Sequence, residues 1–169
     1  GEIDPNTATV NVHAHFKPQE FELEYSVNAD GGAVITAYNG GLEEVVIPAS
    51  LGGNPVTEIG EWAFFDNSSS KKISLPDSVR SIGYGAFSTC YALEEIDLGE
   101  GVEVIGTSAF SDCIKLEKIT LPESLTELGN ACFYGCSKLK EITVPSKITV
   151  INNATFSDCY ALTKVNLGK

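Results

Sequence analysis

Four cysteines recur through the sequence at a constant interval of 23 residues. Thiols can form disulfides or bind zinc, so this spacing could serve chemistry. If the interval reflects stacked structural repeats, the thiols lie in one file, about 5 Å apart, and point side by side. Four sulfurs in a line cannot surround a zinc ion tetrahedrally. The sequence therefore predicts buried, reduced cysteines and no cofactor; the file comprises Cys90, Cys113, Cys136 and Cys159.

The two histidines, His13 and His15, alternate with apolar residues in "VNVHAHF". On a strand both would share one face and could supply two metal ligands, but the sequence offers no obvious third. We predict an exposed polar face, with a metal site as the alternative. Because neither histidine lies among the repeats, no imidazole base is available there for a serine or cysteine nucleophile.

Three acidic residues, Glu95, Asp97 and Glu141, are the candidates for glycoside-type hydrolysis, which uses a pair of carboxyl groups. One of the pair must be a general acid with a raised pKa. Lysines predicted beside these residues favour the ionised form instead. The sequence therefore predicts a protein that is not an enzyme, and a glycoside hydrolase is a remote alternative.

The overall charge excludes some classes of partner. The formal net charge is −12 and the pI is about 4.5, and no cluster of lysine and arginine occurs. Nucleic acids and anionic membranes require a basic patch, so neither is expected as a partner. No apolar run approaches the roughly 18 residues that a membrane-spanning helix needs, so membrane insertion is not expected either.

A repeat of 23 residues explains most of these spacings. The segment "ISL" (Ile73–Leu75) recurs as "IDL", "ITL", "ITV" and "VNL", and an earlier copy, "VVI", begins at Val45. Alternating apolar and polar residues are typical of a half-buried strand. The motif "IGxxAF" follows and predicts a tight corner with a short helical turn. One unit cannot bury its own apolar side, so the copies must stack to build a core.

Charges support this stacking register. The residue before each strand's first apolar residue alternates in sign, as Glu44, Lys72, Glu95, Lys118, Glu141 and Lys164. In a parallel sheet these residues are lateral neighbours, and each exposed pair contributes roughly 0.2–1 kcal/mol. Sliding a strand by one coil would place like charges together, so we interpret the pattern as a structural ladder.

The segment "LEEIDL" (Leu93–Leu98), together with "IGxxAFxxCxxL", resembles the BspA-type (Treponema-like) leucine-rich repeat family of secreted and cell-surface bacterial proteins. The resemblance covers residues 42–169 as five full repeats and the start of a sixth. It implies a leucine-rich repeat solenoid, which is a right-handed, β-rich α/β superhelix with one parallel sheet. It also implies secretion or a cell-surface location after removal of a signal peptide. The first copy departs from the pattern, because Asn67 and Ser70 replace the cysteine and the leucine.

The two ends differ from the repeats. Residues 20–41 are predicted to form a β-hairpin cap, with the turn "NADGG" between two alternating segments. Residues 1–19 are a tail or linker, with an extra strand as the alternative. The strand Val165–Leu167 would leave an exposed edge, so we expect either a longer array or two copies that meet end to end.

The exposed side of the strands is the candidate binding surface, because repeat proteins use such extended faces for partners. The family resemblance implies adhesion to a host matrix or cell-surface protein. The alternative is a structural spacer, because this face has one apolar residue and no aromatic or arginine anchor. The candidate residues are Glu44, Val46, Lys72, Ser74, Glu95, Asp97, Lys118, Thr120, Glu141, Thr143, Lys164 and Asn166.

Overall fold

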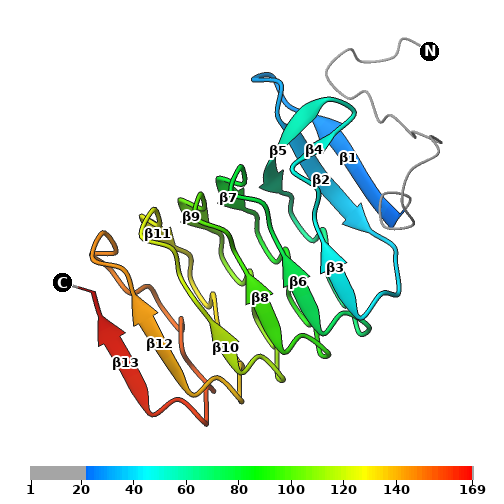
Figure 1. The fold of residues 1–169 in the computed structure, drawn as a ribbon. Helices are drawn as coiled ribbons and strands as arrows, with labels where there is room; N and C mark the ends of the chain where they lie inside the picture. The colour runs from blue at the N-terminus through cyan, green and yellow to red at the C-terminus, as the bar shows by residue number, and fades with distance from the viewer. Residues whose placement is uncertain (1–21, 169) are drawn as a thin grey trace.

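The computed structural model describes residues 22–168, which coil into a solenoid of stacked turns (Figure 1). Every element is a strand, and the strands form two rows along the solenoid. The first row contains β3 (Glu44–Val46), β6 (Lys72–Ser74), β8 (Glu95–Asp97), β10 (Lys118–Ile119), β12 (Glu141–Val144) and β13 (Lys164–Leu167). Parallel pairing joins β3, β6, β8 and β10 in this order, and joins β12 to β13. The repeat and its strands are confirmed.

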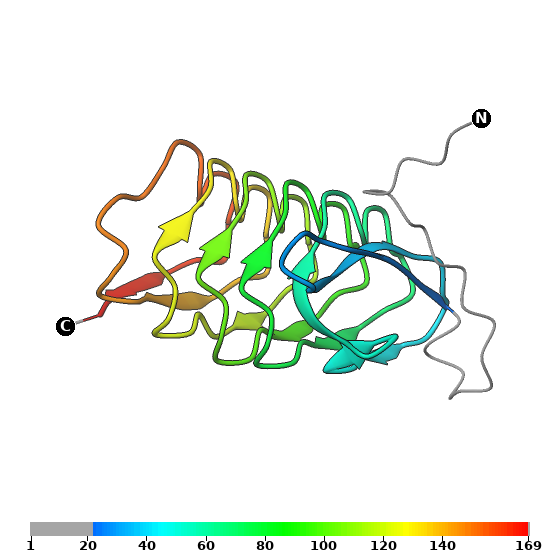
Figure 2. The same cartoon turned by 90° about the horizontal axis from the view of Figure 1, so that it is seen from above.

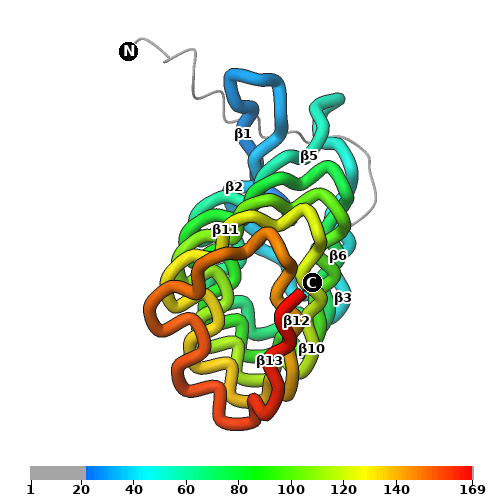
Figure 3. The backbone as a smooth tube through the Cα atoms, turned by 90° about the vertical axis from the view of Figure 1, so that its left-hand side faces the viewer, coloured from blue at the N-terminus to red at the C-terminus, as the bar shows by residue number. Residues whose placement is uncertain are grey.

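A second parallel sheet was not predicted from the sequence. It contains β5 (Asn54–Ile59), β7 (Ser81–Ile82), β9 (Val104–Ile105) and β11 (Glu127–Leu128). Each of the last three strands is only two residues long, so it leaves no alternating pattern to recognise in the sequence. Ile82, Ile105 and Leu128 are buried and close the core opposite the first row. Viewed along the axis, the coils superpose around this core (Figure 3).

The corner after the second sheet consists of turns, where the sequence predicted short helical turns. Two residues of each corner have left-handed backbone angles. In the third coil these are Ser108, with φ 55°, and Asp112, with φ 59°. A left-handed residue cannot continue a right-handed helix, so the chain changes direction twice within five residues. The same two positions recur in every corner from residue 62 to residue 158.

A stack of aromatic rings runs through the core. Phe64, Phe87, Phe110 and Phe133 are at most 1% exposed, and neighbouring ring centroids lie 5.0–5.5 Å apart. From Phe87 onward the ring planes differ by no more than 6°. Each ring comes from the "AF" of one corner. The 23-residue period therefore places identical large side chains in direct contact from coil to coil.

The N-terminal hairpin extends this stack. It comprises β1 (Leu23–Val27) and β2 (Ala33–Tyr38), which pair antiparallel, and β2 pairs in parallel with β5. The Tyr38 ring lies 5.0 Å from that of Phe64, in the place that a preceding phenylalanine would fill. Its hydroxyl accepts a hydrogen bond from the backbone N–H of Leu42. The hairpin thus closes the end of the solenoid (Figure 2). Its strand β2 continues the second sheet, and Tyr38 continues the aromatic stack.

The loop before the second sheet contains one further short strand. β4 (Ser50–Leu51) pairs antiparallel with the start of β5. Gly52 and Gly53 make the turn between them, with φ 55° and 84°. The five extra residues of the first repeat therefore form a small hairpin on the surface, and the spacing of the strands is kept.

The last coil adds no strand to the second sheet, unlike the coils before it. Gly106 and Gly129 each donate a backbone N–H to the coil before, to the carbonyls of Ile82 and Ile105 respectively. Asn152 occupies the equivalent place, and its side-chain amide donates to the carbonyl of Leu128 at 2.6 Å instead. A residue with a Cβ atom cannot approach the preceding backbone as glycine does. Residues 148–152 therefore form no strand beside β11 (Figure 1).

Candidate functional site

The outward side of the first row, here called the strand face, carries all twelve candidate residues. Ten are exposed, whereas Ser74 and Asn166 are half-buried. Their inward neighbours Val45, Ile73 and Ile96 are at most 3% exposed, so the alternation predicted from the sequence is correct. The structure brings the candidates together in one row of strands, which consists of the sheet from β3 to β10 followed by the pair β12 and β13 (Figure 1).

A shallow hollow lies on this face between β8 and β10. Its volume is about 130 Å³, and Glu95, Asp97, Lys118 and Thr120 line it together with two isoleucines. It is open to solvent and lined by charged and hydroxyl groups. Such a hollow is smaller than the 300–1,000 Å³ typical of pockets for small organic ligands. The hollow is therefore too small to enclose a ligand of that size.

The charge ladder has the predicted register. Glu44 pairs with Lys72 and Lys72 with Glu95 as direct neighbours in the sheet. Lys118 continues the row beside Glu95. Within the last pair of strands, Lys164 Nζ lies 3.9 Å from a carboxylate oxygen of Glu141. Opposite charges therefore face one another from β3 to β10 and again between β12 and β13, as the predicted stacking requires.

Shorter ion pairs occur one residue earlier in the chain. Lys71 Nζ lies 2.8 Å from Glu43, and Lys140 Nζ lies 3.3 Å from Glu117. These side chains are 45–70% exposed, so each pair contributes little to stability. This neighbouring column of charges was not predicted from the sequence, because its signs do not alternate.

The three carboxylates proposed for glycoside chemistry lie on the strand face. Glu95, Asp97 and Glu141 are all exposed, and Glu95 has Lys72 on one side and Lys118 on the other. A general acid in a glycosidase needs an apolar enclosure that keeps it protonated. The surroundings of Glu95 offer a neighbouring lysine on each side instead.

The predicted metal ligands His13 and His15 lie outside the described residues. Within residues 22–168, no group of three or more histidine, cysteine, aspartate or glutamate side chains is arranged to hold a metal ion. The same part of the chain contains no helix that is long and apolar enough to cross a membrane.

The cysteine file has the predicted architecture. All five cysteines are buried and free. Each thiol in the file donates to the carbonyl of a phenylalanine in the preceding coil, as from Cys113 Sγ to Phe87 O at 3.1 Å. Cys90, Cys136 and Cys159 repeat this bond at 3.0–3.2 Å. The thiol is thus a small side chain whose weak donor meets a buried carbonyl in every coil.

We expect these thiols to be unreactive in the folded protein and reactive after unfolding. Burial raises the pKa of Cys113, Cys132 and Cys136, so the nucleophilic thiolate is disfavoured. Titration with DTNB should give slow reaction under native conditions and close to five thiols per chain in denaturant. A denatured count near one would mean that disulfides form and would contradict the structure.

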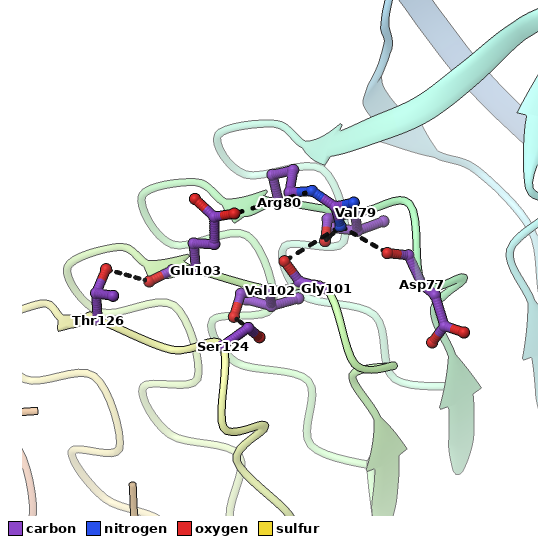
Figure 4. Close-up of polar contacts among 8 residues, drawn as sticks. All are labelled: Asp77, Val79, Arg80, Gly101, Val102, Glu103, Ser124 and Thr126. Atoms are coloured by element: carbon purple, nitrogen blue, oxygen red, sulfur yellow. Dashed lines mark hydrogen bonds and ion pairs between the residues drawn. The ribbon is translucent and has the colours of Figure 1, made fainter. Parts of the chain in front are cut away.

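The turn that precedes β7 is held by Arg80, the single arginine of the chain (Figure 4). Arg80 Nη1 donates to the carbonyls of Asp77 at 2.6 Å, Val79 at 3.3 Å and Gly101 at 3.2 Å. Its Nε lies 3.9 Å from Glu103. The guanidinium therefore fastens the turns of two successive coils to each other. This role is structural, and nothing in the spacing of the sequence pointed to it.

Exposed aromatic side chains gather at the corners rather than on the strand face. Trp62 is 44% exposed, Phe65 53% and Tyr84 44%. Phe65 and Tyr84 both make edge-to-face contacts with Trp62, at centroid distances of 5.1 and 4.8 Å. These residues were not predicted as binding anchors, because they lie outside the strands predicted from the sequence. The available signal was a bulky residue at Trp62, where the other coils have Gly85, Ser108, Ala131 and Ala154.

Comparison with known proteins agrees with this architecture. Residues 37–169 match the BspA type leucine rich repeat region, in six copies. No curated protein matches the sequence.

Solved structures give the same result. A leucine rich repeat protein of T. pallidum is 36% identical, with a TM-score of 0.83, over 85% of this chain and 68% of that protein. A leucine rich cell surface protein of Faecalibacterium prausnitzii is 32% identical, with a TM-score of 0.79, over 86% of this chain and 41% of that protein. A leucine-rich repeat protein of Bacteroides capillosus is 28% identical, with a TM-score of 0.61, over 96% of this chain and all of that protein. With its repeat motifs, stacked coils and these matches, the chain belongs to the BspA-type leucine-rich repeat family.

Proposed function

We propose that this chain is a non-catalytic interaction module of a secreted or cell-surface bacterial protein. It would bind a protein partner, such as a host matrix or cell-surface protein, through the strand face. The observation that carries this proposal is the row of exposed polar and charged side chains, which lies over a buried apolar core. A relative of 32% identity is described as a cell surface protein, which supports the location.

The strand face favours many weak contacts over a few strong ones. Val46, 56% exposed, is its one large apolar side chain among the first five strands, and no aromatic ring lies on it. Tight interfaces concentrate their energy in tryptophan, tyrosine and arginine. This composition also suits the alternative role of a spacer that projects another domain, so the two roles need a direct test.

The test compares the hollow of the strand face with a matched site elsewhere. One variant carries Glu95→Gln, Asp97→Asn and Lys118→Gln, which removes two acids and one base. The control carries Glu123→Gln, Glu127→Gln and Lys147→Gln, which makes the same change of charge at exposed residues outside the strand face. Binding of each protein to immobilised host matrix proteins is measured by surface plasmon resonance.

We expect saturable binding of the unmodified chain and of the control, and a loss of about tenfold or more in the face variant, which corresponds to roughly 1.4 kcal/mol. An equal loss in both variants would mean that net charge, rather than this face, governs binding. Absence of saturable binding by all three folded proteins would contradict the interaction role and support the spacer.

A further inference from the structure

The three exposed aromatic residues of the first corners form a cluster that the fold does not require. Every position in this cluster can be compared with equivalent positions in the other coils. Phe65 corresponds to Ser88, Ser111, Tyr134 and Ser157, and Tyr84 corresponds to Glu61, Thr107, Asn130 and Asn153. The other coils thus fold with mostly small or polar residues at the places where these two coils expose large rings.

Trp62 is the most demanding member of the cluster. It is the single tryptophan of the chain and has a left-handed φ of 58°. A left-handed conformation costs a residue with a side chain roughly 1–2 kcal/mol, and bulky residues rarely adopt it. Equivalent positions have glycine, serine or alanine with φ between 50° and 58°. A large, strained and 44% exposed residue at this place indicates a role other than folding.

The next coil makes room for the indole. The backbone carbonyl of Tyr84 accepts a hydrogen bond from the Trp62 backbone N–H at 3.0 Å, and the Tyr84 ring contacts the indole edge to face. A Cβ atom at Gly85 would collide with Cζ3 of Trp62, so the indole lies directly on the Gly85 backbone. The cluster is therefore built from two successive coils and holds its rings in a fixed arrangement, as a binding anchor requires.

Negative charge borders the cluster. Glu61 precedes Trp62 and occupies the position equivalent to Tyr84, so these two residues are neighbours in adjacent coils. Glu58 lies nearby at the end of β5, where burial and the charge of Glu61 raise its pKa. Among the described residues, no lysine or arginine forms an ion pair with either carboxylate. A positive charge brought to this edge would therefore be stabilised both by the carboxylates and by the aromatic rings.

We propose that this aromatic corner is a second docking surface, and that it takes an arginine- or lysine-bearing segment of a partner protein; its residues are Glu58, Glu61, Trp62, Phe65 and Tyr84. The corner follows the second sheet, so it is separate from the strand face and does not depend on that face's role. Aromatic faces attract cations most strongly in tryptophan, and the two carboxylates supply the opposite charge. The partner segment would place its cationic side chain against the exposed indole of Trp62.

The single tryptophan provides a direct readout. The probe is a fluorescein-labelled peptide of alternating arginine and glycine, and the reference peptide has neutral citrulline in place of arginine. We expect the arginine peptide to change Trp62 emission saturably and the citrulline peptide to leave it unchanged. Affinities for all variants come from the anisotropy of the labelled peptide.

The variants use residues that the chain itself has at equivalent positions. Trp62→Ala copies Ala131, Phe65→Ser copies Ser88, and Tyr84→Thr copies Thr107, so each should fold. Trp62→Ala should weaken binding about fivefold or more, since an exposed cation–π contact contributes about 0.5–1 kcal/mol and the other rings lose their support. Glu58→Gln with Glu61→Gln should weaken binding and reduce its salt dependence.

Two controls separate this proposal from general attraction to an acidic protein. Glu95→Gln with Glu141→Gln removes the same charge from the strand face and should leave peptide affinity unchanged. Equal binding by folded Trp62→Ala and by the unmodified chain would overturn the proposal. Quenching of Trp62 by neutral oligosaccharides but not by the arginine peptide would also overturn it and assign the corner to a glycan. If the unmodified chain binds the arginine peptide but no matrix protein, that result counts against the proposed role of the strand face and leaves the aromatic corner supported.

Discussion

Replacing Phe110 by alanine should destabilise the protein by about 3–5 kcal/mol. The ring is fully buried and stacks on Phe87 at 5.2 Å and on Phe133 at 5.5 Å. Removing it leaves a cavity in the middle of the stack and breaks two ring contacts at once. Urea denaturation followed by far-UV circular dichroism measures the change. Because a domain of this size is stable by only about 5–15 kcal/mol, the variant should lose a large part of its stability.

Two further variants define what the ring contributes. Phe110→Leu retains most of the side-chain volume, so it should lower the stability less than Phe110→Ala does. The stability that Phe110→Leu still loses is assigned to ring stacking. Tyr91→Ala removes an aromatic ring that is 43% exposed, and it should change stability by no more than about 0.5 kcal/mol. A loss below about 1 kcal/mol for Phe110→Ala would show that the coils do not depend on the stack.

Adding one methyl group at Gly106 should also destabilise the solenoid. An alanine Cβ at this position would lie 2.8 Å from the carbonyl carbon of Gly83 and 3.0 Å from the carbonyl oxygen of Ile82. These are backbone atoms of the preceding coil and cannot rotate away. We expect strain of about 1–3 kcal/mol, which exceeds the gain of about 0.4–1 kcal/mol from a less flexible unfolded chain.

The matched control is Gly41→Ala. A Cβ atom there meets no atom within 4 Å, so the effect on the unfolded chain should dominate and stability should stay equal or rise slightly. Both variants are compared by chemical denaturation under identical conditions. Equal stability of Gly106→Ala and the unmodified chain would show that the coils can separate locally without cost, against the close approach seen in the structure.

This close approach also explains a residue that the motif alone did not. The sequence shows glycine at this place in four copies, three as "IG" and one as "LG", and asparagine in the fifth, at Asn152. No glycine of the "IG" motif has a positive φ, so the reason for glycine is the distance between coils rather than backbone conformation. Asn152 stands in the coil that departs from the second sheet and bonds the preceding coil through its side chain.

The sequence by itself determined the repeat, the register of the strand face and the cysteine file. Because the period is a strict 23 residues, each residue lies beside the residue that follows it by 23 positions, in the next coil. Contacts along the axis can therefore be read from the sequence. The alternation around Ile73 and Ile96 separates inside from outside, and the charges of Lys72 and Glu95 fix the pairing. These features depend only on the spacing of residues along the chain, which the sequence shows directly.

Only the tertiary structure decided how each coil closes. The second sheet has strands of two residues, and the corners depend on left-handed angles at residues such as Ser108 and Asp112 that carry no sequence rule of their own. The aromatic corner likewise joins Trp62 to Tyr84, which are 22 residues apart and belong to different coils. Exposure and contact across the corner follow from the path of the backbone around the coil. The period fixes what lies next to each residue along the axis, whereas the direction in which a side chain points is set by turns that the pattern of residue types does not specify.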